Sequence, residues 1–458
     1  MVEDWKRGLF NIKSHKKINL RKKVETTSLK ISFYYHTMKV LKFRQLFYSF
    51  IIMSLLTVAG CNSNNDGPKP YDGPTKRAVL LYAVASNNLY SNLRSDKAEI
   101  IKAANNMNLD GLSMLVYQVA PTGNPQLFEL RRIKSDSCEF VPIKEYSREL
   151  YSTDPKRISE VIADVKNICN AEKYGLILWS HGTGIDPSFS THGVVEKNLT
   201  NATESEEFGN SVLISNLPLL YSFGSDNDPE KDGRYYDETD IDELAEAIPD
   251  NMFDFIWFDA CYMSGIETIY QLRNKCDYFV GYPTEVYTPG MPYDLTIPYI
   301  LKDNPDLKGA AEAFFNYYAN HASSTYRVAT VVVADVNKIE NVADYCKSAY
   351  SLAITPDANG LQKYSRSHFG PFYDFGQYTR LMAQSNPDAP SVEEFDAVMD
   401  NFVVYKAATD KDFNFNPISP ENYSGISCYC FSETDSSDKA LYYRTLDWYK
   451  RVYPQIEE

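Results

Sequence analysis

The sequence predicts an α/β fold: a mostly parallel sheet flanked by helices, followed by a smaller α+β subdomain at the C-terminal end. Short apolar runs alternate with helical segments between residues 78 and 334, which is typical of strands joined by helices that cover both faces of a sheet. Two of these runs, residues 174–179 and 253–259, stop abruptly at small and polar residues, as buried strands do where they enter a loop. After about residue 350, aromatic-rich segments alternate with Pro, Asp and Ser turns, which indicates a separate subdomain.

The first half of the sheet domain is predicted from its apolar runs and from one helix start. Asp154 followed by Pro155 predicts a helix N-terminus, because aspartate caps free N–H groups and proline is tolerated in the first turn. We expect strands at 78–85, 112–119 and 126–133, the last two as a hairpin, helices at 91–106 and 155–169, and a strand at 174–179.

The second half follows a polar stretch, residues 185–236, which shows little periodicity and is predicted to be a long loop. Thr239 is expected to cap the next helix, since its hydroxyl can accept from a backbone N–H. The later elements are expected as helix 241–248, strand 253–259, helix 264–274, strand 278–282, helix 307–321 and strand 328–334. The main domain is thus predicted to span residues 76–350.

The C-terminal subdomain is predicted to comprise residues 351–458. Residues 392–407 read as one long helix, residues 423–431 alternate as a strand, and residues 441–453 form a final amphipathic helix. Support of the main sheet is its expected role.

The charge of the chain is unevenly distributed. Its 458 residues carry a net charge of -15. Residues 1–60 hold 12 Lys and Arg against 3 Asp and Glu, whereas the remainder holds 34 against 58. The excess of acidic residues after residue 60 argues against nucleic acid as a partner and is typical of a secreted or surface protein. We expect a monomer.

The cysteines and histidines do not predict a metal site. The eight cysteines show neither the CxxC spacing of a zinc or redox site nor a disulfide framework, and the chain has only six histidines. Most of the cysteines lie in apolar sequence and are predicted to be buried thiols.

The N-terminal region has the pattern of a secretory signal that starts at Met38. Basic residues follow Met38, an apolar run covers residues 46–59, and small residues lead to Cys61. This arrangement resembles a bacterial lipoprotein signal, in which the cysteine is lipidated and becomes the mature N-terminus. The apolar run of about 14 residues is short against the roughly 20 of a transmembrane helix, and a plain membrane anchor and an ordinary signal peptide are the alternatives.

This interpretation divides the first 75 residues into three parts. Residues 1–37 are predicted to be a mis-assigned upstream extension, since a signal peptide should begin at its basic region. Residues 38–60 form the signal peptide, and the Gly-, Pro- and Asn-rich residues 61–75 form a tethering linker. The protein is therefore expected to be extracytoplasmic and lipid-anchored to a bacterial membrane, at the cell envelope or surface.

His181 and Cys261 follow the two strands that end abruptly. Functional groups gather at the carboxyl ends of parallel strands, so the fold can bring these side chains together. A thiol needs a nearby imidazole to act as a nucleophile near neutral pH. When each residue is considered alone, Cys261 has the alternative of an inert buried thiol. His181 has the alternative of a loop histidine bonded to a backbone carbonyl. Among the other histidines, only His192 in the long loop competes.

The residues around these strand ends resemble the clostripain-like cysteine peptidases, relatives of caspases, legumains and gingipains. Those families place a His-Gly pair after one strand and an Ala-Cys pair after a later one, here His181-Gly182 and Ala260-Cys261. The clostripain-like version has an aspartate before the alanine, which matches Asp259.

The resemblance covers the chain from about residue 78 to the C-terminus and implies a caspase-like sheet. It includes the acidic and then helical segment 237–248 and the Tyr-Ser-Gly-Ile-Ser sequence at 423–427. One departure lies after the histidine, where residues 182–187 read Gly-Thr-Gly-Ile-Asp-Pro instead of further glycines and a tryptophan. This departure concerns the wall of the substrate site rather than the Cys/His pair.

The resemblance implies a cysteine endopeptidase that requires no cofactor and acts on protein or peptide substrates. Cys261 would attack the scissile carbonyl to form an acyl-enzyme, while His181 would assist the thiol and protonate the leaving amine. The backbone N–H groups of Gly182 and Cys261 would form the oxyanion hole, since glycine permits close backbone approach.

Cleavage after Arg or Lys is what the family suggests, with a carboxylate at the base of the pocket as its physical cause. Asp259 would either line that pocket or fix its own turn by accepting backbone hydrogen bonds, and the sequence leaves both interpretations open. Glu285 and Asp294, in the loop after the next strand, are further candidates.

The long loop after His181 suggests self-activation, because related zymogens mature by cutting themselves in this region. Lys197, Lys231 and Arg234 are the candidate activation cleavage sites, and a plain surface insertion is the alternative.

The same loop holds an acidic cluster whose carboxylates offer oxygen ligands for calcium, which some relatives use, although the spacing is irregular. Its members are Asp226, Asp228, Glu230 and Asp232.

A rival function is that of a catalytically inactive surface lipoprotein that binds a protein or a glycan on the same scaffold. Retention of both His181 and Cys261 argues against it. A serine hydrolase of the α/β type is excluded because no GxSxG elbow occurs in the chain.

Overall fold

The computed structural model describes residues 73–185, 223–227, 236–355, 357–364 and 372–453. Across these ranges, no helix combines the length and the apolar character needed to cross a bilayer. The predicted upstream extension, the signal peptide and Cys61 lie outside the described residues.

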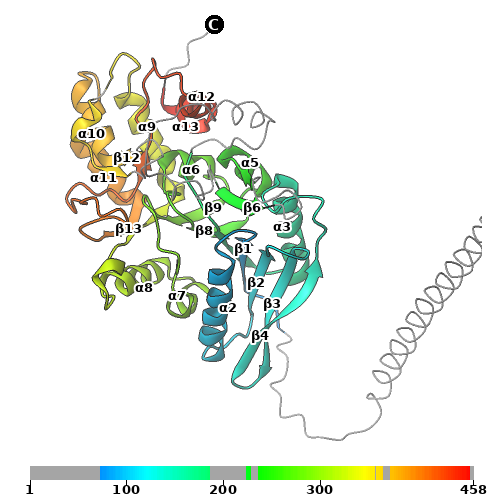
Figure 1. The fold of residues 1–458 in the computed structure, drawn as a ribbon. Helices are drawn as coiled ribbons and strands as arrows, with labels where there is room; N and C mark the ends of the chain where they lie inside the picture. Colours follow the sequence, from blue (N-terminus) through cyan, green and yellow to red (C-terminus); the bar gives the residue numbers. More distant parts are fainter. Residues whose placement is uncertain (1–72, 186–222, 228–235, 356, 365–371, 454–458) are drawn as a thin grey trace, which may run out of the picture. The chain divides into compact units, whose positions relative to one another are not determined.

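A nine-stranded sheet organises the described residues (Figure 1). Its strands are β1 (Arg77–Val84), β2 (Leu112–Val119), β3 (Gln126–Lys134), β4 (Ser137–Glu145), β5 (Lys173–Trp179), β8 (Phe253–Asp259), β9 (Cys276–Gly281), β10 (Thr330–Asp335) and β13 (Val403–Ala408). They are ordered β13-β10-β9-β8-β5-β1-β2-β3-β4. All eight residues of β1 are buried, because this strand lies inside the sheet between β5 and β2.

The middle of the sheet is parallel and its edges are antiparallel. β1 pairs in parallel with β2 and β5, and β8 pairs in parallel with β5 and β9. β3 and β4 extend one edge as a hairpin, while β10 and β13 extend the other edge. The predicted mostly parallel sheet is confirmed. β4 was not predicted, because its sequence contains a proline and several charged residues in place of a clear apolar run.

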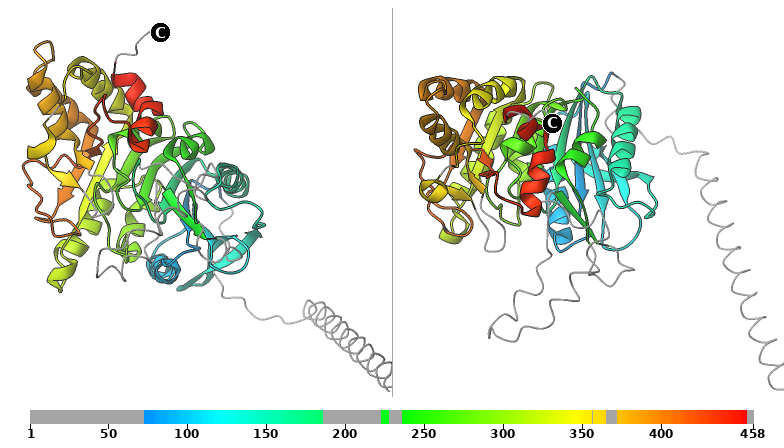
Figure 2. Two further views of the ribbon diagram at one scale, coloured as in Figure 1. Left: turned by 45° about the horizontal axis from the view of Figure 1, so that its top comes forward. Right: turned by 90° about the horizontal axis from the view of Figure 1, so that it is seen from above.

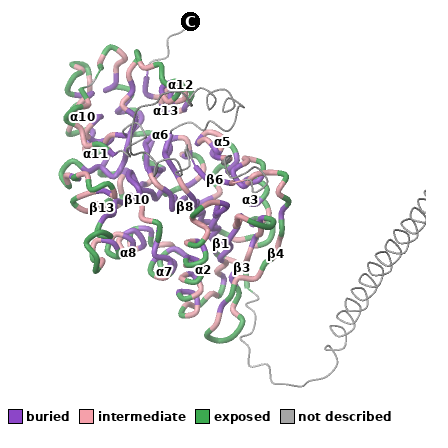
Figure 3. Tube along the Cα trace, in the orientation of Figure 1, coloured by how far each residue is buried: buried purple, intermediate pink, exposed green. Residues whose placement is uncertain are grey.

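Helices cover both faces of the sheet, as predicted (Figure 1 and Figure 2). One face packs against α2 (Tyr90–Asn105), α7 (Tyr293–Ile300) and α8 (Leu307–Ala319), and the other against α3 (Pro155–Cys169), α5 (Ile241–Ala247), α6 (Ile266–Gln271) and α9 (Ile339–Ala349). Successive strand residues point to opposite faces, so Val79 and Leu81 belong to the first core and Leu80 and Tyr82 to the second. Figure 3 shows this buried interior along the central strands.

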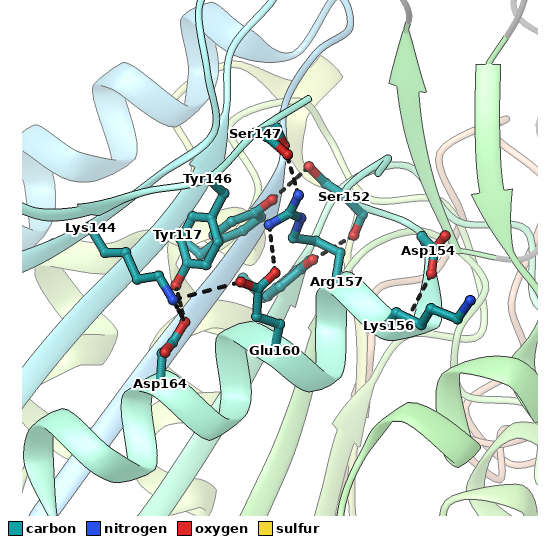
Figure 4. A network of polar contacts seen from close by, with 11 residues as sticks. Tyr117, Lys144, Tyr146, Ser147, Ser152, Asp154, Lys156, Arg157, Glu160 and Asp164 are labelled. Atoms are coloured by element: carbon teal, nitrogen blue, oxygen red, sulfur yellow. Dashed lines mark hydrogen bonds and ion pairs between the residues drawn. The ribbon is translucent and has the colours of Figure 1, made fainter. Parts of the chain in front are cut away.

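The N-terminus of α3 is fixed by the residues that predicted it (Figure 4). The Asp154 carboxylate accepts from the N–H of Lys156 at 2.8 Å, and Pro155 occupies the first turn. The buried Arg157, one position further, donates to the Ser147 carbonyl at 2.7 Å. The helix is therefore tied to the chain segment that precedes it.

The stretch 185–236 is not a loop throughout, which corrects the prediction. It contains β6 (Phe223–Asn227), which pairs antiparallel with β7 (Tyr236–Thr239). β6 lies beside the end of β1, where the Asn227 N–H donates to the Ser86 carbonyl at 3.1 Å. The sequence of β6, Phe-Gly-Ser-Asp-Asn, has no apolar periodicity, so only the pairing partner identifies it as a strand.

Two helices differ from their predicted ends. Asp240 rather than Thr239 caps α5, because Asp240 forms a capping box with Glu243 while Thr239 ends β7. α6 is shorter than the predicted 264–274, because residues 264 and 265 make sheet-like contacts with other segments instead.

The C-terminal residues do not form a body separate from the sheet, which corrects the boundary predicted at residue 350. The described residues between 73 and 453 belong to one compact unit. The predicted helix 392–407 splits into α11 (Val392–Phe402) and β13, which pairs with β10 at the edge of the main sheet. Valines at 403 and 404 favour this change, because β-branched residues fit a pleated strand better than a helix.

The remaining C-terminal elements are short. They are α10 (Phe375–Ser385), α12 (Asp438–Thr445), α13 (Asp447–Val452), the 3-10 turns Ser324–Tyr326, Val336–Lys338 and Ala358–Gly360, and a small sheet of β11 (Lys363–Tyr364), β12 (Phe372–Asp374) and β14 (Ser427–Cys428). The predicted strand 423–431 is thus limited to β14. The predicted helix 441–453 breaks at Leu446, which is extended and fully buried.

Candidate active site

The ends of β5 and β8 lie side by side at the carboxyl edge of the sheet. The two strands are parallel neighbours in which Trp179 pairs with Asp259. His181 and Cys261 each come two residues after this pair, and neighbouring strands lie about 4.8 Å apart. The fold therefore brings the loops that carry the histidine and the cysteine to one edge.

Gly182 is the contact point between these two loops. A Cβ added to it would lie 2.7 Å from the Cys261 carbonyl oxygen and 2.9 Å from the Met263 sulfur. No other residue fits so close a backbone approach. A glycine is thus required at this position by the packing of one loop on the other.

His181 is partly exposed and forms a hydrogen bond with a side chain from the end of β1. Its Nε2 lies 2.8 Å from Oδ1 of Asn88. This hydrogen bond orients the imidazole ring at the edge of the sheet. Sequence reasoning missed Asn88, although it follows a third parallel strand that ends at the same edge.

Cys261 is partly buried, and its thiol faces the segment that follows β9. Its Sγ accepts from the Val286 N–H at 3.3 Å and lies 3.9 Å from the Val286 carbonyl oxygen. The next residue, Tyr262, has a φ of 59°, and its N–H donates to the Thr284 carbonyl at 3.0 Å. A left-handed tyrosine is costly, by about 1–3 kcal/mol, and persists only where the surroundings fix it.

The segment 424–428 supports the cysteine loop from behind. Ser427 donates its N–H to the Ser264 carbonyl at 3.1 Å, and the Ser264 hydroxyl donates to the Gly425 carbonyl at 3.1 Å. On α6, the buried Glu267 accepts from the Tyr429 N–H at 2.8 Å. The C-terminal part of the chain thus holds the nucleophile loop in place.

Asp259, two residues before the cysteine, is 5% exposed and points into the loop before α7. Both carboxylate oxygens lie 3.2 Å from the Met291 N–H, and the Tyr293 hydroxyl donates to Oδ2 at 3.0 Å. Burial raises the pKa of Asp259 to about 6, against these hydrogen bonds, which lower it. This geometry favours the interpretation that Asp259 anchors a loop.

A second buried carboxylate lies on α2 under the same edge. Asp96 is 3% exposed and lies near the Trp179 side chain at the end of β5, and its Oδ2 has no hydrogen-bond partner among the described residues. Burial, with the nearby negative charges of Asp259 and Glu99, raises the pKa of Asp96 to about 9. Sequence reasoning missed Asp96, because nothing in a helical segment indicates which polar residue turns inward.

The two other candidate pocket residues lie in different surroundings. Glu285 is buried beside Val286, which contacts the Cys261 sulfur, and its Oε2 accepts from the Asn414 side chain at 3.1 Å. Asp294 begins α7 and forms an ion pair with Lys102 of α2 at 2.5 Å. Glu285 is therefore adjacent to the thiol, whereas Asp294 already has a cationic partner.

The candidate cleavage sites Lys197, Lys231 and Arg234 lie outside the described residues, as does His192. Of the acidic cluster, only Asp226 is described. It is buried and accepts from the Ser152 N–H at 2.6 Å. Within the described ranges, no group of three His, Cys, Asp or Glu side chains is placed to hold a metal ion.

The other described cysteines differ from Cys261. None of the seven described cysteines forms a disulfide, and four of them, Cys138, Cys276, Cys346 and Cys428, are buried. Burial raises the pKa of each of these four thiols. The described part of the chain thus confirms buried thiols rather than disulfides, and Cys261 alone among the described cysteines lies at the end of a central parallel strand.

The site therefore combines a thiol, an imidazole and two loops in backbone contact. The sequence matches the model of the clostripain family over residues 81–204 and 226–443, which include both loops. The chain belongs to the clostripain family. It is a cysteine peptidase, and its C-terminal part, through residue 443, lies within the family match.

Solved structures of C11 peptidases share the fold of this clostripain-family chain. One is described as an inactive zymogen C11 protease from Parabacteroides distasonis, with 26% identity, a TM-score of 0.65, and coverage of 83% of this chain and 99% of that one. Another is a secreted C11 cysteine protease from Bacteroides thetaiotaomicron in complex with an irreversible peptide inhibitor, with 25% identity, a TM-score of 0.66, and coverage of 82% and 98%. The predicted caspase-like fold is confirmed. No curated protein matches this chain significantly.

Proposed function

We propose that this peptidase is an endopeptidase in which Cys261 is the nucleophile and His181 the proton-transfer group. The thiolate attacks the scissile carbonyl, the imidazole protonates the leaving amine, and water then hydrolyses the acyl-enzyme. The single observation that carries this proposal is the pairing of Trp179 with Asp259, two residues before each of the two groups. The hydrogen bond between Nε2 of His181 and the Asn88 side chain supports this role, because it orients the ring.

The oxyanion of the tetrahedral intermediate is proposed to bind the backbone N–H groups of Gly182 and Cys261. The close packing of Gly182 on the Cys261 carbonyl supports this arrangement, because both N–H groups then lie on loops that touch. Loss of one such donor typically costs about 2.7–4 kcal/mol of barrier.

Cleavage after Arg or Lys is the proposed specificity. Acidic side chains near the cysteine support it: Glu285 lies next to the residue that contacts the sulfur, and Asp259 lies two residues before the cysteine. Asp259 contributes less than Glu285 in this proposal, since it is buried and already accepts from the Met291 N–H and the Tyr293 hydroxyl. Asp294 contributes less in this proposal, since Lys102 already neutralises it.

The direct test is a panel of fluorogenic peptides with Arg, Lys, Asn or Asp at the cleaved position, assayed with and without thiol alkylation. We expect turnover of the Arg and Lys peptides that alkylation and Cys261→Ala both abolish. A partly buried cysteine elsewhere, Cys430, offers the matched control, since Cys430→Ala should retain full turnover. No turnover of any peptide would instead favour the inactive binding protein.

Self-activation by cleavage within residues 185–236 is a second part of the proposal. It is supported by the description of a relative as an inactive zymogen and by the basic residues Lys197, Lys231 and Arg234. Wild type should appear as two fragments on a denaturing gel and Cys261→Ala as one. A single intact band from both proteins would exclude self-processing.

We propose an extracytoplasmic, monomeric enzyme anchored by a lipid on Cys61, without a required cofactor. A relative described as secreted and the acidic body of the chain support this location. A clickable fatty acid should label wild type and not Cys61→Ser. Gel filtration tests the monomer, and a chelator tests whether calcium contributes to activity or stability.

A further inference from the structure

Three aromatic rings lie in contact near the cysteine, those of Tyr287, Tyr326 and Phe413. Phe415 follows Phe413 in the same turn, and the four residues are here named the aromatic shelf. The ring of Tyr287 lies 4.8 Å from that of Tyr326 and 4.7 Å from that of Phe413, between centroids. Tyr326 is 39% exposed and Phe415 is 53% exposed. So large an exposed aromatic group is unusual away from a binding site.

The shelf is continuous with the candidate active site at two points. Val286 donates its N–H to the Cys261 sulfur at 3.3 Å, and Tyr287 is the next residue. On the other side, the Asn414 amide donates to the Glu285 carboxylate at 3.1 Å, and Asn414 stands between Phe413 and Phe415 in the chain. The turn that carries the two phenylalanines is therefore fixed to the segment that contacts the sulfur.

Phe415 occupies a backbone conformation that glycine or asparagine would adopt with less strain. Its φ is 62°. Asp412 holds the turn, since its carbonyl accepts from the Phe415 N–H at 3.0 Å and its carboxylate accepts from the Asn416 N–H at 2.8 Å. A strained and exposed phenylalanine in a rigid turn does not serve packing of the core. It is 53% exposed, and the Lys411 ammonium lies 4.6 Å from the ring centroid.

The direction of the substrate decides which half of a peptide reaches the shelf. In the proposed mechanism, His181 protonates the leaving amine, so the amine half must face β5. The strand order places β5 on one side of β8 and places β9, β10 and β13 on the other. The shelf residues follow β9, α8 and β13. The acyl half, attached to the sulfur and directed away from His181, therefore extends toward the shelf.

We propose that the aromatic shelf binds a bulky apolar side chain within the three residues before the basic residue at the cleaved bond. The occupant is the acyl half of the substrate peptide. This inference rests on the proposed function, and it adds a second specificity element to the basic residue at the cleaved position. Aromatic rings at 4.5–7 Å spacing favour contact with aromatic and large aliphatic side chains.

The test uses Phe415→Gly and Phe415→Asn, because both residues tolerate the positive φ and the turn should survive. Leu441→Ala, which removes a side chain that is 50% exposed on α12, is the matched control. A denatured protein is digested with each variant, and the cleavage sites are mapped by mass spectrometry. A matched pair of Arg peptides, with Phe or Ala varied at each of the three preceding positions, gives kcat and KM.

We expect wild type to cleave the preferred Phe peptide with roughly 10-fold higher kcat/KM than its Ala counterpart. Both Phe415 variants should lose most of this preference through KM while they cleave the Ala peptide as wild type does, and their melting temperatures should be equal or higher. Leu441→Ala should change nothing.

The outcomes separate the two proposals. Efficient cleavage without any apolar preference, or an equal loss on Phe and Ala peptides, would overturn the shelf and leave the peptidase mechanism intact. Cleavage after residues other than Arg or Lys would overturn the proposed basic specificity, while the mapped sites would still report the apolar preference. No cleavage at all would remove the peptidase proposal and the shelf with it.

Discussion

The cysteine loop and the histidine loop meet at one edge of the sheet but are held by different kinds of interaction. The cysteine loop is tied by backbone hydrogen bonds on two sides, from Tyr262 to Thr284 and from Ser427 to Ser264. Its nucleophile is thus set by main-chain geometry that few substitutions can alter.

The histidine loop relies more on side chains. The Ser180 hydroxyl donates to the Val84 carbonyl at 2.8 Å, and His181 bonds to the Asn88 amide. Its one described backbone link to β6 is the Gly224 N–H, which donates to the His181 carbonyl at 3.1 Å. Cys261 is therefore positioned by the backbone of the fold, whereas His181 is oriented by individual side chains that can be changed one at a time.

The largest effect is expected where the two loops touch. Gly182→Ala would add a Cβ at 2.7 Å from the Cys261 carbonyl oxygen and would force the loops apart. We expect kcat/KM to fall by about 100-fold or more, as for a displacement of about 1 Å in an active site. Gly360→Ala is the control, since a Cβ there meets nothing within 4 Å. Full activity of a folded Gly182→Ala enzyme would refute the close approach.

A smaller effect is expected from the side chain that orients the base. Asn88→Ala removes the side chain that forms a hydrogen bond with Nε2 of His181, so the ring loses a contact that orients it. We expect kcat to fall roughly 10-fold with little change in KM. Asn88→Asp should keep a hydrogen-bond partner for the ring. Its negative charge favours the protonated imidazole, so the acidic limb of the pH profile should shift to higher pH. Asn401→Ala, on the exposed surface of α11, should behave as wild type.

The buried carboxylate under the histidine strand predicts a dependence of stability on pH. The pKa of Asp96 is raised from 3.8 to about 9, so the fold favours its protonated form. Its contribution to stability is complete below pH 3.8 and is lost as the pH rises through 9. Asp96→Asn should therefore melt at a more constant temperature than wild type between pH 6 and 9. The difference should reach several degrees, since 1 kcal/mol corresponds to about 2–4 °C.

The smallest effect, a change in melting temperature, is expected from Glu267 on α6 behind the cysteine loop. Burial raises the pKa of Glu267 from 4.5 to about 7, so its contribution is complete below pH 4.5 and is lost as the pH rises through 7. Glu267→Gln keeps an acceptor for the Tyr429 N–H and removes the titration. We expect a gain in melting temperature of about 2 °C relative to wild type at pH 8, and none at pH 4. An equal shift at both values would mean that the residue acts through packing alone.

Local sequence was sufficient where one segment carries its own signal. Asp154 and Pro155 fixed the start of α3, and the apolar runs before His181 and Cys261 were correctly predicted as strands. Local sequence was not sufficient where the neighbouring strand decides the secondary structure. Residues 403–408 continue a helical pattern but pair with β10, and β6 has no apolar pattern of its own.

The amino-acid sequence by itself determined the class of fold, the family and the two residues proposed for chemistry, because apolar periodicity and the residue types at two strand ends are local properties. Only the tertiary structure decided what surrounds them. Asn88, Asp96 and Phe415 lie near the strand ends or the loops beside them through contacts between segments far apart in the chain. Such contacts depend on which strands become neighbours, and no single segment encodes that choice.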